Sequence, residues 1–242
     1  MKWLSLDSPF MVALGKMADL MWINILTLLL CVPVVTAGAA FTAMNYVALK
    51  IVRDEECYIT KAYFHSFKQN FLQATGLWLI VLAFVGMIVA DLYLISTGAI
   101  SIPYFARWAL LGIAIIVLMI AIMIFPIQAR FSNTVMGTIK SAFTVAILQF
   151  PKTLVVLVMY GISFAIAIYY IQILPLFIVF GFSAPAFVNA KFCDKLFKKL
   201  EDKYYEEHPE QSPDYEAETG DEHIFNDNVD LISAEGTNEK GK

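Results

Sequence analysis

Residues 153–190 of the chain read TLVVLVMYGISFAIAIYYIQILPLFIVFGFSAPAFVNA and contain no Asp, Glu, Lys or Arg. As one continuous helix this stretch would be about 57 Å long, at 1.5 Å per residue. The hydrocarbon core of a bilayer is only about 30 Å thick and takes about 20 residues per crossing. The stretch therefore predicts two membrane-spanning helices. We expect the break between Gln172 and Pro175, because proline cannot donate a helical hydrogen bond.

The composition of the whole chain agrees with a membrane protein. Hydrophobic residues make up 59% of the 242 residues and charged residues 16%, with a mean hydropathy of +0.68. Ordinary soluble domains contain about 25% charged and about 45–50% apolar residues. We therefore expect an all-α polytopic membrane protein whose main partner is the lipid bilayer.

Other uncharged runs define the remaining spans of a transmembrane domain over residues 1–205. We predict a bundle of five or six transmembrane helices over residues 9–32, 36–52, 70–92, 106–128, 153–171 and 174–190. The first run is ambiguous. A hairpin broken at Pro33, Thr36 and Gly38, with Thr36 as the cap of the second helix, gives six spans. A single kinked crossing gives five spans and an external N-terminus.

Basic residues indicate which side of the membrane each connection faces. When these spans are threaded through a membrane, residues 50–68, 130–152 and 191–203 place twelve Lys and Arg residues on one face, and Arg107 alone falls on the other. The positive-inside rule assigns the first face, with the C-terminus, to the cytoplasm. The net charge is +7 over residues 1–200 and −11 over residues 201–242. We expect residues 206–242 to form a disordered acidic cytoplasmic tail.

Polar residues inside the apolar runs are the first candidates for function. Asp91 and Arg107 flank a short outer connection, and we predict an ion pair between them at the outer interface. Structural support is the favoured role of this pair, with a substrate or ion contact as the alternative. Amides could line a path or hydrogen-bond neighbouring helices, and the second role is favoured. These amides are Asn24, Asn45, Gln128, Asn133, Gln149 and Asn189.

Two segments of the predicted cytoplasmic face combine aromatic and basic residues. Residues 57–73 predict an amphipathic interfacial helix, and residues 191–205 predict a juxtamembrane helix. We interpret these segments as a surface for lipid head groups, or alternatively for a cytoplasmic partner. The candidate residues of this surface are Lys61, Tyr63, Phe67, Lys68, Phe71, Lys195, Lys198 and Lys199.

Motifs for enzymatic chemistry are missing from the sequence. It contains no Walker loop, HExxH or GxSxG pattern, and its three cysteines and three histidines are scattered without ligand spacing. We therefore predict a protein that is not an enzyme, with no catalytic residues, no metal site and no cofactor. We expect no nucleic-acid partner.

Several stretches of the first 80 residues resemble the YesL family of bacterial integral membrane proteins, named for a domain of unknown function. The stretches are DSPF at residues 7–10, DLMWIN at 19–24, VPVVTAG at 32–38, LKIVRDEE at 49–56 and SFKQNFLQAT at 66–75. The resemblance implies a small multi-span protein, often encoded among carbohydrate-uptake and carbohydrate-degradation functions. It implies no activity and no site residues. The long acidic tail departs from the family's shorter chains.

Three functions are compatible with these observations. The leading hypothesis is a non-enzymatic accessory or permease-like subunit associated with carbohydrate uptake, partnered by a carbohydrate transport complex. The first alternative is a membrane signalling scaffold whose acidic tail recruits or regulates a signalling protein at the cytoplasmic face. The second is an autonomous small-molecule transporter.

Overall fold

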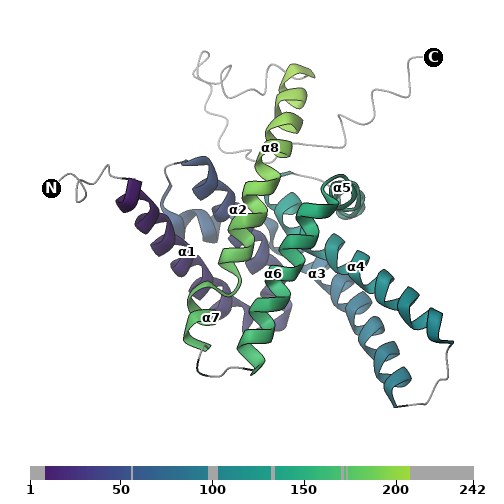
Figure 1. The fold of residues 1–242 in the computed structure, drawn as a ribbon. Helices are drawn as coiled ribbons and strands as arrows, with labels where there is room; N and C mark the ends of the chain where they lie inside the picture. Colours follow the sequence, from purple (N-terminus) through teal and green to yellow (C-terminus); the bar gives the residue numbers. More distant parts are fainter. Residues whose placement is uncertain are drawn as a thin grey trace, which may run out of the picture.

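A computed structural model describes residues 9–55, 57–97, 103–131, 134–169, 172 and 174–207. The regular elements within these ranges are all helical, which confirms the all-α fold (Figure 1). They are α1 (Pro9–Cys31), the short 3₁₀ helix η2 (Val34–Thr36), α2 (Ala37–Arg53), α3 (Ile59–Ser96), α4 (Tyr104–Arg130), α5 (Val135–Leu148), α6 (Phe150–Tyr169), α7 (Leu174–Phe180) and α8 (Ser183–Glu207). The predicted acidic tail lies outside the described residues from residue 208 onward.

Six of the described helical segments are long and apolar enough to cross a membrane. The first two, Phe10–Cys31 and Val34–Arg53, arise from the N-terminal run, so that run contains two helices. The last, Leu174–Asp202, comprises α7 and most of α8. A multi-pass membrane protein follows from the number and composition of these helices.

Helix α2 lies at the centre of the bundle, in contact with α1, α3, α4 and α8. Most of its residues are buried, and its first half is rich in alanine and glycine. At Gly38 the backbones of α2 and α3 lie very close together. A Cβ atom at this position would lie 2.5 Å from Cβ of Trp78 and against the carbonyl oxygen of Ala74. Small residues allow helix backbones to approach closely in membranes, where van der Waals packing takes the place of the hydrophobic effect.

The turn between α1 and α2 corrects the predicted role of Thr36. Its side chain makes no capping hydrogen bond to α2. The hydroxyl instead donates backwards, to the carbonyl oxygens of Leu30 and, at 2.8 Å, Pro33. Thr36 therefore closes the end of α1, whose last carbonyl groups lack helical partners. Of the predicted break residues, Pro33 and Thr36 lie at the observed break, whereas Gly38 lies inside α2.

Helix α3 is one continuous helix of 38 residues. The sequence predicted two elements, an interfacial helix over residues 57–73 and a span over residues 70–92. They merge because Gln69, Asn70 and Gln73 are compatible with a helix and no proline interrupts the segment. At 1.5 Å per residue α3 is about 57 Å long, so it extends well beyond a hydrocarbon core of about 30 Å.

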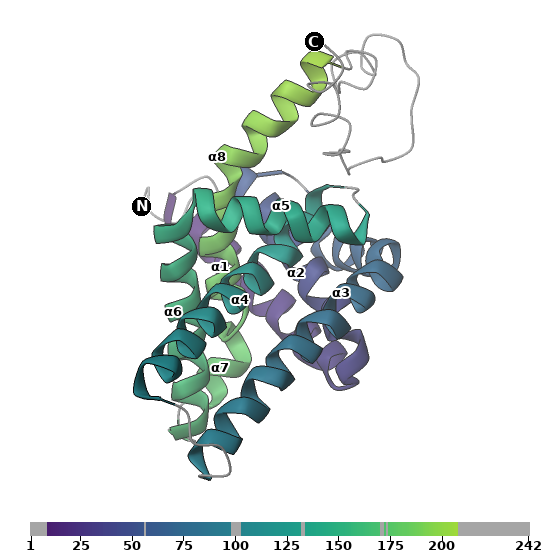
Figure 2. The same ribbon diagram turned by 90° about the vertical axis from the view of Figure 1, so that its right-hand side faces the viewer.

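Helix α5 lies across the end of the bundle that the sequence assigned to the cytoplasm (Figure 2). Its N-cap is Thr134, whose hydroxyl accepts from the backbone N–H of Gly137 at 3.2 Å. One face of α5, including Thr138, Ala142 and Val145, is buried against the bundle. The basic inner connection of residues 130–152 is thus largely helical.

The uncharged run of residues 153–190 breaks twice. The first break follows Tyr169, where α6 ends, and agrees with the predicted position. The second, at Gly181 and Phe182, separates α7 from α8 and was not predicted. Gly181 is required there, because a Cβ atom would lie 2.5 Å from the ring of Phe177.

Asn24 of α1 holds the second break together. Its Nδ2 donates to the carbonyl oxygens of Phe177 and Ile178 at 3.2 and 2.6 Å. Its Oδ1 accepts from the backbone N–H groups of Phe182 and Ser183, each at 2.9 Å. One buried amide therefore satisfies the end of α7 and the start of α8, where backbone groups lack helical partners. This is the interhelical role expected for such amides.

We predict that Asn24→Ala lowers the free energy of unfolding by about 2–3 kcal/mol, because it leaves buried backbone groups at both helix ends without partners. Thermal or denaturant unfolding in detergent would measure the change. Asn45→Ala is the matched control, since the amide of Asn45 bonds only within its own helix, to the carbonyl oxygen of Phe41. Equal destabilisation by the two substitutions would contradict the role assigned to Asn24.

We also predict that Gly38→Ala destabilises the protein by about 1–3 kcal/mol, because the added methyl group forces α2 and α3 apart. The same unfolding experiment applies. Gly76→Ala provides the control on α3, since a Cβ atom there meets nothing within 4 Å. That substitution is expected to be neutral or slightly stabilising, as alanine favours a helix over glycine.

Candidate functional site

The last turn of α2 begins a cluster of charged side chains at the end of the bundle that carries α5. Lys50 and Arg53 are the basic residues of this turn, where the helix dipole favours positive charge. Asp54 follows in the left-handed conformation, with φ of 57°, and ends the helix. The backbone N–H of Glu55 then donates to the carbonyl oxygen of Lys50 at 3.1 Å. The chain reversal places Glu55 beside both basic side chains.

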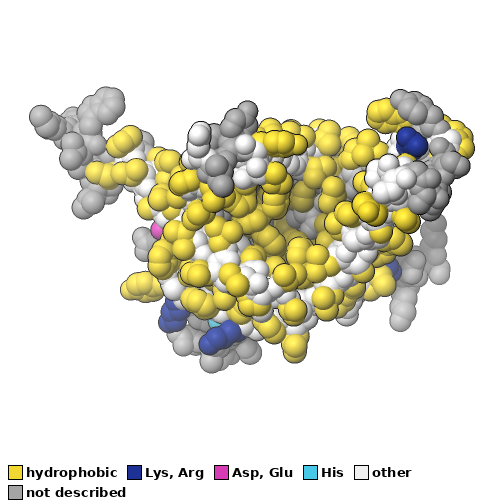
Figure 3. Space-filling model, turned by 90° about the horizontal axis from the view of Figure 1, so that it is seen from below, with side chains coloured by type: hydrophobic (Ala, Val, Ile, Leu, Met, Phe, Trp, Pro, Cys, Tyr) yellow, Lys and Arg dark blue, Asp and Glu magenta, His cyan; other side chains and the backbone are white. Residues whose placement is uncertain are grey.

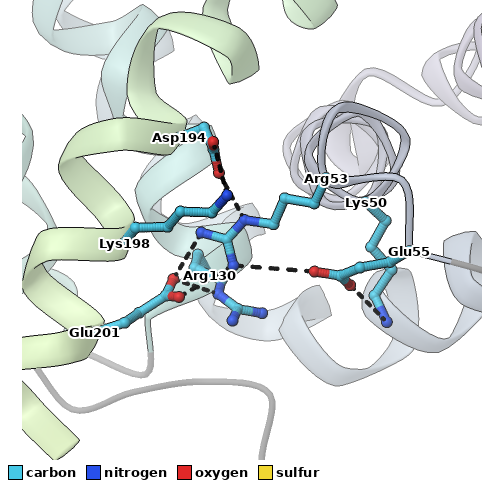
Figure 4. Close-up of polar contacts among 7 residues, drawn as sticks. All are labelled: Lys50, Arg53, Glu55, Arg130, Asp194, Lys198 and Glu201. Carbon is cyan, nitrogen blue, oxygen red and sulfur yellow. Dashed lines mark hydrogen bonds and ion pairs between the residues drawn. The ribbon is translucent and has the colours of Figure 1, made fainter.

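Arg53 is the centre of the cluster and binds two carboxylates of α8 (Figure 4). Its Nε donates to Asp194 at 2.8 Å. Its two terminal nitrogens donate to the two carboxylate oxygens of Glu201, at 3.0 and 3.1 Å. Such two-pronged pairing matches the planar geometry of guanidinium and carboxylate groups and is strong for a hydrogen-bonded ion pair.

Arg130, the last residue of α4, brings a third helix into the cluster. Its Nε donates to Glu201 at 2.7 Å, so this carboxylate is shared by two arginines. The side chains of Arg53 and Glu201 are each 8% exposed. Two guanidinium groups and two carboxylates make the buried part electrically balanced. Its direct effect is to fasten the ends of α2, α4 and α8 to one another.

The outer part of the cluster is more exposed. Lys198 lies 3.3 Å from Asp194, and its side chain is 55% exposed. Lys50 lies 3.8 Å from Glu55, and of this pair only the Glu55 side chain is exposed, at 38%. Exposed pairs of this kind contribute about 0–1 kcal/mol. The buried arginine pairs therefore dominate the energetics of the cluster.

A buried amide network attaches α5 to this end of the bundle. The Nε2 of Gln128 donates to Oδ1 of Asn70 on α3 at 3.1 Å, and its Oε1 accepts from the hydroxyl of Thr138 on α5 at 3.0 Å. Gln128 and Thr138 are completely or almost completely buried. The network joins α3, α4 and α5, so the position of α5 is determined by hydrogen bonds as well as by packing.

The outward face of α5 is largely apolar, although the exposed Lys140 and Thr144 also lie on it. Met136, Phe143 and Ile147 recur at helical spacing and are 62, 48 and 57% exposed. The same helix buries its opposite face in the bundle. An apolar stripe held in place at the end of a membrane bundle provides a contact surface for lipid or for another membrane protein.

The residues that the sequence assigned to a cytoplasmic surface divide into two groups. Tyr63 is fully buried, and its hydroxyl donates to the carbonyl oxygen of Ala40 at 3.2 Å, so its assignment to the surface was wrong. Phe67 and Phe71 are half-buried, with ring centroids 5.5 Å apart. Their side of α3 faces the bundle. The lysines of the predicted surface remain exposed, namely Lys61, Lys68, Lys195, Lys198 and Lys199.

The predicted ion pair between Asp91 and Arg107 does not form among the described residues. Asp91 lies more than one turn before Ser96, the last residue of α3, whereas Arg107 lies in the first turn of α4. Arg107 is exposed and Asp91 is half-buried.

Sequence reasoning missed the charged cluster because it grouped Glu201 with the acidic tail. A signal was nevertheless present. Asp194 is the one acidic residue between positions 57 and 200 besides Asp91, and Glu201 follows it at a spacing of seven, which is two helical turns. The buried Phe197 lies between them on the same side of α8. This pattern is typical of a helix face that packs against basic groups.

The described residues show neither a cluster of metal ligands nor an activated thiol. No group of three or more His, Cys, Asp or Glu side chains there could hold a metal ion. The three cysteines are free thiols. Burial raises the pKa of the Cys57 thiol, the dominant effect over the opposing charge of Lys50, so this thiol is protonated and weakly nucleophilic at neutral pH.

We predict that Glu201→Gln destabilises the protein by about 3–5 kcal/mol, because it leaves Arg53 and Arg130 partly buried without their shared counter-charge. Thermal unfolding in detergent would measure this loss. Adding Arg130→Gln should restore part of the stability, since the second change removes one of the unpaired charges. Lys198→Gln is the control and should cost at most about 1 kcal/mol. A Glu201→Gln effect no larger than this control would show that the cluster does not fasten the helices.

Comparison with known proteins finds one family match, in the N-terminal part of the bundle. No curated protein and no solved structure matches the chain. Residues 20–92 match the family model described as Protein of unknown function, DUF624, and this segment runs from α1 to near the end of α3. It contains the α2–α3 crossing at Gly38 and the central Arg53. DUF624 includes the YesL-like bacterial membrane proteins, so the chain is a helical membrane protein that carries a DUF624 domain.

Proposed function

We propose that this protein is a non-enzymatic accessory or permease-like subunit associated with carbohydrate uptake. The supporting observation is the outward apolar stripe of α5, which the Gln128 network and the adjoining charged cluster hold at one end of the bundle. A rigid surface of this kind suits stable association with another membrane protein, because little conformational entropy is lost when it binds.

The carbohydrate part of the proposal depends on the resemblance to YesL-like proteins, which are often encoded beside carbohydrate functions. The partner we expect is a carbohydrate transport complex with an apolar cytoplasmic-side surface that fits Met136, Phe143 and Ile147. We further infer that the protein resides in the bacterial cell membrane with its C-terminus in the cytoplasm. The twelve-to-one distribution of basic residues supports this orientation.

We predict that the tagged protein, purified from its own cells in mild detergent, brings a sugar permease or transport ATPase with it. Deletion of the gene should lower uptake of the corresponding labelled sugar, and the intact chain should restore it. Mass spectrometry of the purified complex and uptake assays are the measurements. A protein that purifies alone, together with unchanged sugar uptake in the deletion strain, would refute the proposal.

Paired substitutions can test whether α5 is the contact surface. Met136→Ser with Ile147→Ser should abolish co-purification while leaving the unfolding temperature nearly unchanged, because both side chains point outward. Val158→Ser with Ile162→Ser on α6 makes a similar change at residues that are 52 and 54% exposed. This control should retain the partner. Loss of the partner in both variants would mean that binding depends on the lipid-facing surface in general and not specifically on α5.

A signalling scaffold is the second candidate, favoured by the opposite charges of the body and of residues 201–242. The exposed Lys195 and Lys199 of α8 lie just before the acidic segment. In this case truncation after residue 205 would change the binding of a cytoplasmic partner, and the change would weaken with increasing salt. A truncation that alters sugar uptake but no such binding would favour the accessory subunit.

A further inference from the structure

A cavity of about 410 Å³ lies between α2, α3, α4 and α6, at the end of the bundle remote from the charged cluster. Seen from that end, the molecule is hollowed and its visible side chains are mostly hydrophobic (Figure 3). The volume is within the range of about 300–1,000 Å³ that is typical of small-molecule sites. The charged cluster, α5 and the cytoplasmic lysines contribute nothing to its walls.

Aromatic rings form much of the cavity wall. They come from five separate parts of the bundle, namely Phe41, Trp78, Phe125, Tyr160, Phe164 and Phe182. The ring of Phe41 lies 5.9 Å from that of Trp78 and 5.2 Å from that of Phe182, measured between centroids. Rings at such separations favour a further ring in edge-on or offset contact. The wall therefore suits a ligand that contains a ring.

Two polar side chains interrupt this apolar wall, those of Asn45 and Tyr160. Asn45 is 5% exposed, and its Nδ2 donates to the carbonyl oxygen of Phe41 at 2.8 Å. Because that carbonyl can only accept, the orientation of the amide is determined. The Oδ1 atom is then left buried with no hydrogen-bond partner among the described residues. An unsatisfied buried acceptor lowers stability, so a ligand donor that reaches it gains binding free energy.

The hydroxyl of Tyr160 also has no hydrogen bond to the described part of the chain. Together the two side chains offer one acceptor and one group that can donate or accept. No charged residue is among those that line the cavity. Transfer of an ion into such surroundings is costly, which favours a neutral ligand. A sugar fits poorly, since its many hydroxyl groups would need more polar partners than the wall provides.

We propose that this cavity binds a neutral, ring-bearing alcohol or phenol whose hydroxyl donates to Oδ1 of Asn45. The ring packs among the aromatic side chains, and Tyr160 accepts from or donates to the same hydroxyl. This site is separate from the α5 surface. The protein would thus carry a ligand site of its own in addition to any partner that it binds.

Bromine quenches tryptophan fluorescence on contact, and Trp78 lies in the cavity wall. The test uses full-length protein in which Trp3, Trp22 and Trp108 are replaced by phenylalanine. It is titrated with 4-bromophenol and with its methyl ether 4-bromoanisole, which has no hydrogen-bond donor. We expect saturable quenching by both probes, with the phenol binding about tenfold more tightly.

Two substitutions at the cavity should distinguish the contribution of the hydrogen bond to binding from that of the cavity volume. Asn45→Leu should remove the preference for the phenol over the ether. Gly161→Leu should abolish saturable quenching by both probes, because a Cβ atom there meets nothing within 4 Å and the side chain can fill the cavity. Gly112→Leu, also at an open position but outside the cavity wall, should leave both titrations unchanged.

Three results would overturn the proposal. Quenching that rises linearly and is unaffected by Gly161→Leu would mean that the probes only partition into the detergent. Saturable binding with equal affinity for the two probes would mean a site for apolar rings without the hydroxyl contact. Retention of the phenol preference in Asn45→Leu would exclude Asn45 as the acceptor. The comparison of the two probes needs no substitution at Asn45, so it remains valid if that variant does not fold.

Discussion

Close packing around α2 is the constraint on which the rest of the bundle depends. Lipid chains are as apolar as leucine, so helices in a bilayer associate through van der Waals contact and hydrogen bonds instead of hydrophobic burial. The small residues in the first half of α2 let neighbouring backbones approach, most closely where α3 crosses Gly38. At its other end, α2 presents Arg53 to the carboxylates of α8. One helix therefore combines tight apolar packing with a two-pronged, largely buried ion pair.

The polar side chains of the bundle are used in two different ways. Asn24 and Gln128 have their hydrogen-bonding groups satisfied by neighbouring helices, and each joins segments far apart in the sequence. Asn45 is bonded only through its Nδ2, which leaves an acceptor unpaired in a cavity wall. Residue type does not distinguish these cases. Only the arrangement of neighbouring helices separates an amide that supports the fold from one that is available to a ligand.

The sequence limited the membrane spans to five or six and located the main breaks, because these follow from length, charge and proline. Pro33 and Pro175 interrupt runs that are too long for one crossing, and both breaks occur. The break at Gly181 was missed because nothing local demands it. It depends on Asn24, more than 150 residues away, which supplies the missing helix-end partners. The continuity of α3 was missed because a local signal was given too much weight. Polar residues at the predicted boundary were interpreted as a helix end, but such residues do not by themselves end a helix.

The charged cluster shows a similar limit. The sequence analysis interpreted Lys and Arg at the ends of spans only as markers of one membrane face. Their pairing with Asp194 and Glu201 depends on how α8 packs against α2 and α4. The heptad spacing of the two acids was a usable signal. Tyr63 was misplaced because helical spacing shows which residues share a face, but not whether that face meets lipid or protein.

The continuous helix α3 has a mechanical consequence. It is held at the Gly38 crossing near its middle, against Ala74 and Trp78. Its outer arm, including Val81 and Val85, forms part of the cavity wall, whereas its inner arm carries Asn70 and the contact to Gln128. The inner arm is also held by the hydrogen bonds from Tyr63 to Ala40 and from Gln128 to Asn70. One stiff helix therefore connects the cavity wall directly to the network that positions α5.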